Sequence, residues 1–202
     1  MSTVPTATTG RTSGASTRAR ILAAASELFY SRGIRATSAD RIIEEVGITK
    51  VTFYRHFRTK SDLVVAYLQE QAEAERAWMG EARSSGDPLA SLHALAVGIG
   101  AASCRPGFRG CAFINAAAEF SDADDPVRVL VDRHRAWMVG EFAAIAADAG
   151  AADPDAIGRR LMLLRDGAMV NGYLGDPERV ADSLDAAFAA IVADPERTAD
   201  LS

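Results

Sequence analysis

The strongest constraint on the fold is a pattern of two short helices joined by a glycine, between residues 42 and 57. Ile42, Ile43 and Val46 recur at helical spacing, which gives the first helix one apolar stripe. Gly47 follows at once, and glycine takes the left-handed conformation that ends a helix without strain. Thr49 can then cap a second helix, whose first N–H groups would otherwise lack partners. The pattern predicts a helix-turn-helix.

The second of these helices carries side chains that can donate hydrogen bonds to phosphates and base edges. Phe53 and Phe57 are four residues apart and should pack inward, so the remaining positions form an outward arc. The N-terminal end of such a helix enters a DNA groove first. For His56, a packing or capping role is the alternative. The residues that we expect to contact DNA are Lys50, Thr52, Tyr54, Arg55 and His56.

Charge is distributed unevenly along the 202 residues, although the net charge of −5 is unusual for a DNA-binding protein. Residues 1–62 contain ten Lys and Arg against five Asp and Glu, a balance of +5. Residues 63–202 contain twelve against twenty-two, a balance of −10. Polyanion binding depends on local positive charge, so the asymmetry favours two domains with different partners.

The N-terminal part divides into a tail and a small basic domain. Residues 1–15 lack bulky apolar side chains and are predicted to be disordered, and residues 16–62 form the helix-turn-helix domain. Its first helix should begin near Ser16 or Thr17 and end at Gly33. Three arginines in or beside the tail could form an arm that touches DNA, and a solvated terminus without a role is the alternative. They are Arg11, Arg18 and Arg20.

Two further positions in this domain are candidates for phosphate contacts. Thr37 or Ser38 should cap the second helix, and Thr37 lies near its phosphate-facing edge unless capping is its whole role. The fourth helix should open with a box in which Asp62 reaches back to Thr59. Lys60 lies at that helix N-terminus, where a phosphate could bind.

Residues 17–65 resemble the N-terminal domain of the tetracycline-repressor (TetR) family without a gap. The matching positions are Arg20 to Ala25, Phe29, Gly33, Thr37, Ser38, Ile42, Gly47 to Thr49, Thr52 to Phe57, Lys60 and Leu63. The resemblance implies an all-α protein, mostly dimeric in this family, with three N-terminal helices for DNA and the remaining helices for ligand binding and dimerisation. It implies DNA contacts at Thr37, Lys50, Thr52, Tyr54, His56 and Lys60. Val51 departs from the family, in which a small residue or proline is common there.

Residues 63–202 are predicted to form an effector-binding and dimerisation domain made of helices. The fourth helix should continue to about Met79, and turn-rich or proline-containing breaks separate the later ones. The expected helices cover residues 89–99, 110–120, 127–149, 155–174 and 177–193. The resemblance implies that the last two helices form a four-helix dimer interface. The alternative is that their apolar stripes are buried within one chain.

An effector pocket in this domain would need polar anchors among apolar side chains. Asn115 and Glu119 share one face of an otherwise apolar helix, and an internal hydrogen-bond network is the alternative. His134 and Trp137 could line a cavity, although such a stripe is more often plain core. The candidate effector contacts are Leu95, Ile99, Phe113, Asn115, Glu119, His134, Trp137, Met138 and Asp166.

The leading hypothesis is therefore a homodimeric repressor that binds a pseudo-palindromic double-stranded DNA operator and is released by a small, mostly apolar effector. The first alternative is redox sensing through Cys104 and Cys111, aided by Arg105 or Arg109. The second is a helical enzyme, which we do not expect because no nucleophile–base pair or phosphate-binding glycine loop is present. We expect no metal and no cofactor. Apolar runs are too short for a membrane span, so we expect a cytoplasmic protein.

Overall fold

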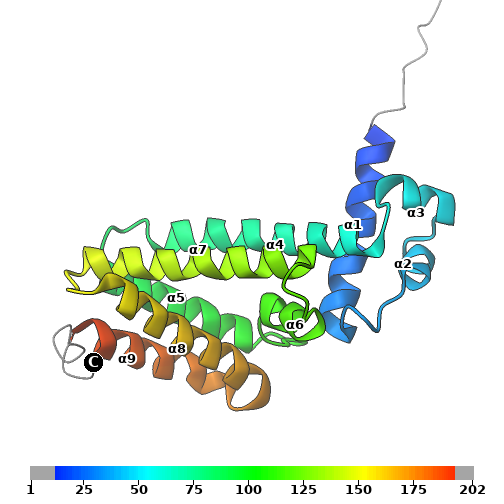
Figure 1. Cartoon of the computed structure of the whole chain (residues 1–202). Coiled ribbons are helices and arrows are strands. Elements are labelled where there is room, and N and C mark those ends of the chain that lie inside the picture. The colour runs from blue at the N-terminus through cyan, green and yellow to red at the C-terminus, as the bar shows by residue number, and fades with distance from the viewer. Residues whose placement is uncertain (1–11, 194–202) are drawn as a thin grey trace, which may run out of the picture. The chain divides into compact units, whose positions relative to one another are not determined.

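The structure is a computed structural model that describes residues 12–193, with side chains from Thr17 onward. Residues 1–11 lie outside the described residues, and with them Arg11 and most of the predicted tail. Within residues 12–193 every regular element is a helix, so the prediction of an all-α fold is confirmed. The helices are α1 (Thr12–Arg32), α2 (Ala39–Val46), α3 (Lys50–His56), α4 (Lys60–Ala82), α5 (Pro88–Ser103), α6 (Ala112–Glu119), α7 (Pro126–Asp148), α8 (Pro154–Leu174), the short 3-10 helix η1 (Pro177–Arg179) and α9 (Val180–Ala193) (Figure 1).

The chain forms two compact units that divide between Tyr67 and Leu68, inside α4. The sequence predicts this boundary between residues 62 and 63. The difference arises because the first turns of α4 contribute to the core of the first unit. Leu63 and Tyr67 are buried there, and the ring of Tyr67 packs edge-on against Phe29 at 5.8 Å.

The first unit is held together by apolar side chains from α1, α2, α3 and the start of α4. Ile21, Ile42, Phe53 and Leu63 are each fully buried. α1 begins at Thr12, earlier than the expected start near Ser16 or Thr17, because no proline interrupts this stretch and the helix can extend. The sequence thus predicts the apolar stripes of this unit well and the start of α1 poorly.

Helices of the second unit begin at repeated Asp-Pro pairs. Asp87, Asp125 and Asp153 each precede a proline at the first helical position. Their carboxylates accept hydrogen bonds from free backbone N–H groups of the first turn at 2.8–2.9 Å. Proline loses nothing at this position, because its missing N–H would have no intrahelical partner. Three helix starts are therefore determined by one local rule.

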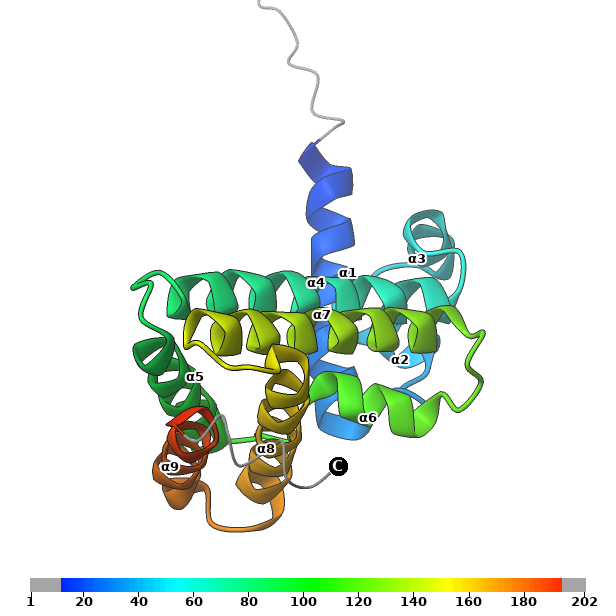
Figure 2. The same cartoon turned by 60° about the vertical axis from the view of Figure 1, so that its left-hand side comes forward.

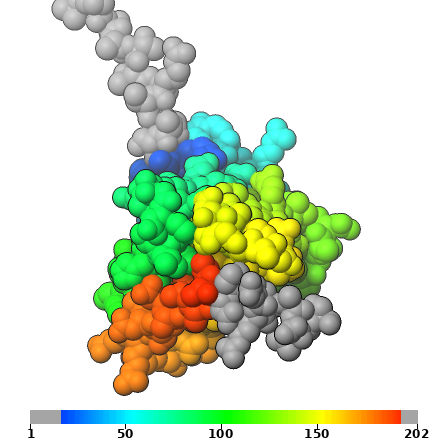
Figure 3. Space-filling view, turned by 90° about the vertical axis from the view of Figure 1, so that its left-hand side faces the viewer, coloured from blue at the N-terminus to red at the C-terminus, as the bar shows by residue number. Residues whose placement is uncertain are grey.

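The core of the second unit lies between α5, α7, α8 and α9. α8 packs against α7, and α9 packs against α5. Figure 2 shows these two pairs, with the second-unit part of α4 beside α7. The α7–α8 contact is close because a Cβ at Gly158 would lie 2.8 Å from the backbone nitrogen of Ala143. Figure 3 shows α9, in orange to red, at the surface of this unit.

Candidate DNA-binding surface and effector site

The turn between α2 and α3 forms as the sequence predicts. Ser38 caps α2 and accepts a hydrogen bond from the backbone N–H of Arg41 at 3.1 Å. Gly47 ends α2 with φ +70°, a conformation that a residue with a Cβ adopts only at a cost. Thr49 then caps α3 by accepting from the backbone N–H of Thr52 at 3.1 Å. The two helices are thus held at a fixed turn.

α3 has one buried face and one exposed face. Phe53 is fully buried and Phe57, which follows the helix, is 3% exposed, so both pack inward as expected. The exposed face is formed by four side chains that follow from the helical spacing: Lys50, Val51, Tyr54 and Arg55. A cation, a phenol and a guanidinium on one helix face suit a polyanion.

Two of the candidate DNA contacts already have partners within this unit. The ammonium group of Lys50 lies 3.1 Å from the carboxylate of Asp40 on α2, and this hydrogen bond raises the pKa of Lys50. The hydroxyl of Thr52 lies 2.9 Å from the hydroxyl of Thr49. Both side chains remain near the surface, so DNA would compete with these contacts.

The structure corrects the expectation for Thr37 and weakens that for His56. Thr37 is 1% exposed, and its hydroxyl donates to the carbonyl oxygen of Gly33 at 2.9 Å, so it is not available to a phosphate. Its role is to secure the turn before α2. His56 is half-buried, and its Nε2 atom is buried without a hydrogen-bond partner. Lys60 is half-buried at the start of α4, where the predicted box of Thr59 and Asp62 is formed with two 3.0 Å hydrogen bonds.

The arginines that could extend the DNA-binding surface have structural partners. Arg20 donates to the carbonyl oxygen of Val46, the last residue of α2, at 2.6 Å. The guanidinium of Arg18 lies over the ring of Phe57, 4.9 Å from its centroid. Both side chains therefore brace the first unit, a role that the interpretation as a DNA-contacting arm left out.

A substitution of Asp40 tests whether its ion pair with Lys50 weakens DNA binding. Asp40→Asn should tighten binding of duplex DNA a few-fold and steepen the salt dependence of log K by about one unit for each subunit, because one more cation is free for a phosphate. Fluorescence anisotropy across a salt series measures both. Glu27→Gln on α1 removes another exposed negative charge of the same unit and is the matched control. Equal effects from the two variants would show that only net charge matters.

A cluster of charged and polar side chains lies inside the second unit. The Nε2 atom of His134 on α7 lies 2.9 Å from the carboxylate of Glu75 on α4. The guanidinium of Arg165 on α8 lies 3.6 Å from the same carboxylate and 3.2 Å from that of Asp166. Burial of Arg165 disfavours its charged form, but the neighbouring Cys111, Glu75 and Asp166 outweigh this and raise its pKa. The cluster joins three helices through charge.

Aromatic rings surround His134. The ring of Phe113 stacks on the imidazole with centroids 3.8 Å apart, and Trp137 lies at 5.2 Å. The guanidinium of Arg76 lies over the ring of Trp137, 5.1 Å from its centroid. His134 also lines a cavity of about 310 Å³ between α4 and α7, together with Gln69, Ala72, Glu73, Arg76, Leu130 and Arg133.

The remaining candidate effector contacts do not converge on this cavity. Leu95, Ile99 and Met138 are buried in the packed core of the unit. Asn115 is exposed and donates to the backbone carbonyl of Arg109 at 2.9 Å, so it is not an anchor inside a pocket. Glu119 is half-buried.

Asp166 pairs with Arg135 and Arg165, which makes it part of the charged cluster. Sequence reasoning missed Glu75 and Arg165. Each occupies a position on the buried stripe of its helix, and a charge at such a position would have revealed them.

The two cysteines occupy different environments. Cys104 is exposed, and its thiol donates to the carbonyl oxygen of Pro177 at 3.6 Å. Cys111 is buried and is the N-cap residue of α6. Both are free, and redox sensing through them stays a prediction. Within residues 12–193, three or more His, Cys, Asp or Glu side chains nowhere gather as a metal site. Over the same range no helix is both long and apolar enough to cross a membrane.

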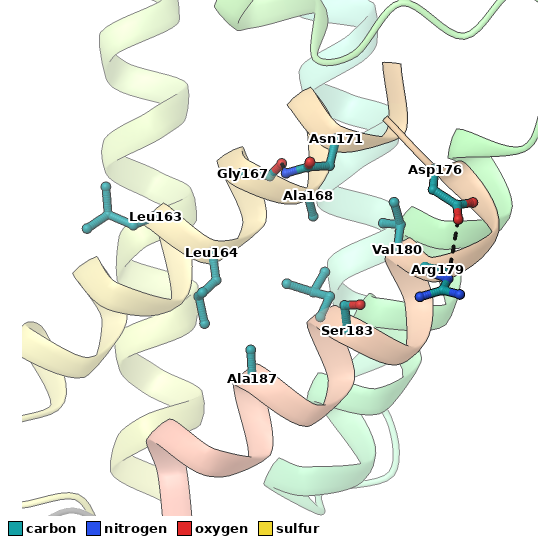
Figure 4. A pocket seen from close by; sticks show the side chains of 11 residues that line it. Leu163, Leu164, Gly167, Ala168, Asn171, Asp176, Arg179, Val180, Ser183 and Ala187 are labelled. Carbon is teal, nitrogen blue, oxygen red and sulfur yellow. Dashed lines mark hydrogen bonds and ion pairs between the residues drawn. The ribbon is translucent and has the colours of Figure 1, made fainter. Parts of the chain in front are cut away.

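α8 presents an apolar face that the other helices within residues 12–193 leave uncovered. Leu163 and Leu174 are 71% and 74% exposed, and Val170 lies on the same stripe with Gly167. A groove of about 420 Å³ runs beside this stripe, between α8 and α9. Figure 4 shows Leu164 and Ala187 pointing into the groove and Leu163 pointing outward.

Comparison with known proteins agrees with this geometry. Residues 21–67 match the family described as bacterial regulatory proteins, tetR family. Over 81 residues the chain is 37% identical to the HTH-type transcriptional regulator TtgR of Pseudomonas putida, and over 83 residues it is 35% identical to AcrR of Shigella flexneri. These matches cover 39% and 40% of this chain, and 39% of the length of each relative.

Solved structures are similar over nearly the whole chain, and one of them has a high sequence identity. It is a TetR-family transcriptional regulator from Streptomyces coelicolor, 40% identical, with a TM-score of 0.85. The similarity covers 89% of this chain and 96% of that one. Both units are included, so the likeness is not confined to the helix-turn-helix. The chain belongs to the TetR family of DNA-binding transcriptional regulators.

Proposed function

We propose that the protein is a homodimeric repressor that acts in the cytoplasm and binds a pseudo-palindromic DNA operator. The observation that carries this proposal is the exposed face of α3, which presents Lys50, Tyr54 and Arg55 from a unit held by the Thr49 cap and the Gly47 turn. Thr52, His56 and Lys60 complete the proposed DNA contacts. Thr37 is not included, because its hydroxyl is bonded internally.

Dimerisation through the last two helices is supported by the uncovered stripe of α8. The apolar side chains of Leu163, Val170 and Leu174 are exposed on one protomer, and a second protomer could bury them. A twofold axis through such a stripe would bring two identical surfaces together. Two α3 helices on one dimer then read half-sites about 34–36 Å apart, one turn of DNA.

The variant Leu163→Arg tests both the proposed dimer interface and its contribution to operator binding. We expect this variant to sediment as a monomer and to lose roughly 100-fold in operator affinity, because each half-site is then bound alone. The operator is first obtained by selection from random duplexes with the unaltered protein. Leu89→Arg on α5, a half-exposed leucine outside the stripe, is the matched control. A dimeric Leu163→Arg variant with full affinity would contradict the proposed interface, and selection that yields no palindromic sequence would contradict the proposed function.

We propose that an effector binds the second unit at the cavity beside His134. Support comes from the cavity itself, from the rings of Phe113 and Trp137 beside His134, and from the unpartnered Nδ1 atom of His134. The lining is mostly polar and charged, so an effector that presents polar groups suits it better than a purely apolar one. It must bind the DNA-incompetent state more tightly, or it shifts nothing. A compound that raises the melting temperature of the protein and releases the operator would identify it.

A further inference from the structure

Val51 is the most exposed large apolar side chain in the described part of the chain, at 80%. Helix stability does not explain a valine here, because a β-branched residue is less favourable than alanine inside a helix. Packing does not explain it either, since the side chain contributes almost no buried area to the first unit. A valine at this position is therefore of no use to the fold.

The side chains on both sides of Val51 are engaged with the protein. Lys50 is paired with Asp40, and the hydroxyl of Thr52 contacts that of Thr49. Val51 projects between them, on the same helix face as Tyr54 and Arg55, three and four residues on. It therefore lies in the middle of the surface that we propose to meet DNA, within a stretch of positive net charge.

In the major groove the apolar group that a base pair offers is the C5-methyl group of thymine. A valine side chain that enters the groove on α3 has this methyl group as its complementary partner. We propose that Val51 packs against the C5-methyl group of one thymine in each half-site and so selects thymine over cytosine at that position. The inference rests on the proposed operator binding and names a residue that sets its specificity.

Deoxyuridine provides the test, because it removes this methyl group and changes nothing else in the base pair. Each thymine of the selected operator is replaced in turn, symmetrically in both half-sites, and binding is measured by fluorescence anisotropy. We expect one position at which affinity falls about fourfold per half-site, the free energy of one buried methyl group. Introducing 5-methylcytosine at that position in a cytosine-substituted operator should recover part of the affinity.

Protein variants decide whether Val51 is the residue that senses the methyl group. Val51→Ala should bind the thymine and deoxyuridine operators equally, while Val51→Ile should retain the preference. Lys50→Ala is the matched control on the neighbouring position, because it should weaken both operators by the same factor. A double-mutant cycle between protein and DNA isolates the contact from general loss of affinity.

The outcomes separate this inference from the function on which it rests. In one outcome the unaltered protein selects a defined operator, but Val51→Ala removes no preference for thymine over deoxyuridine at any position. That result would overturn the role of Val51 and leave operator binding standing. Failure of the unaltered protein to select any operator would overturn both. A preference that disappears in Val51→Ala and persists in Lys50→Ala would support the contact.

Discussion

Replacing Glu75 with leucine is expected to lower the free energy of unfolding by about 3 kcal/mol, since removal of one partner leaves a buried charge uncompensated. The side chain of Arg165 is 5% exposed, and Asp166 would be its one remaining carboxylate partner among those described, although Arg135 already engages it. His134 would lose the acceptor of its Nε2 atom as well. Urea denaturation of the full chain, followed by circular dichroism, measures the loss.

The double variant Glu75→Leu with Arg165→Met distinguishes a charge effect from lost packing. If the buried guanidinium causes the instability, removing it should restore at least about 1 kcal/mol relative to the sum of the single effects. Glu73→Leu on the exposed side of α4 should change stability by less than about 0.5 kcal/mol. Stability of Glu75→Leu equal to that of the Glu73 control would refute the importance of the cluster.

Replacing Phe53 with alanine is expected to destabilise the first unit by about 3–5 kcal/mol and to abolish operator binding. Phe53 is fully buried, and the centroid of its ring lies 5.2 Å from that of Tyr54 and 6.3 Å from that of Phe57. A loss of this size approaches the whole stability of a unit of about 50 residues. Thermal unfolding and DNA binding of the full chain measure the two effects.

Val51→Ala provides the matched control, because it shortens an apolar side chain on the same helix at an exposed position. It should leave the melting temperature unchanged and alter DNA affinity only a few-fold. Equal melting temperatures for Phe53→Ala and Val51→Ala would mean that α3 does not depend on its buried face.

The helix-turn-helix can be predicted from sequence because each of its determinants is local. Gly47 and Thr49 act within one turn of their own positions, and the structure places both in the expected roles. The burial of Thr37 could not be predicted in the same way. Its hydroxyl binds the carbonyl oxygens of Leu28 and Gly33, and which of two adjacent hydroxyls turns inward depends on the packing of α1 against α2.

The effector region is harder to predict because it depends on contacts between distant helices. Leu95 and Asn115 have the residue types of a pocket lining, but one lies in the packed core and the other faces solvent. Glu75, His134 and Arg165 are separated by dozens of residues and meet only when α4, α7 and α8 pack together. Periodicity identifies the buried stripe of each helix and does not reveal which stripes face one another.

The pairing of Lys50 with Asp40 bears on how quickly a regulator finds its site. A genome presents about a million or more competing sequences, and loose attachment to them depends on phosphate contacts. A lysine that is paired with a carboxylate of the same protein contributes less to such loose attachment. A dimer would carry two such pairs and spend less time trapped on irrelevant DNA. The ion pair would thereby shorten the search for the operator at the expense of some affinity once it is found.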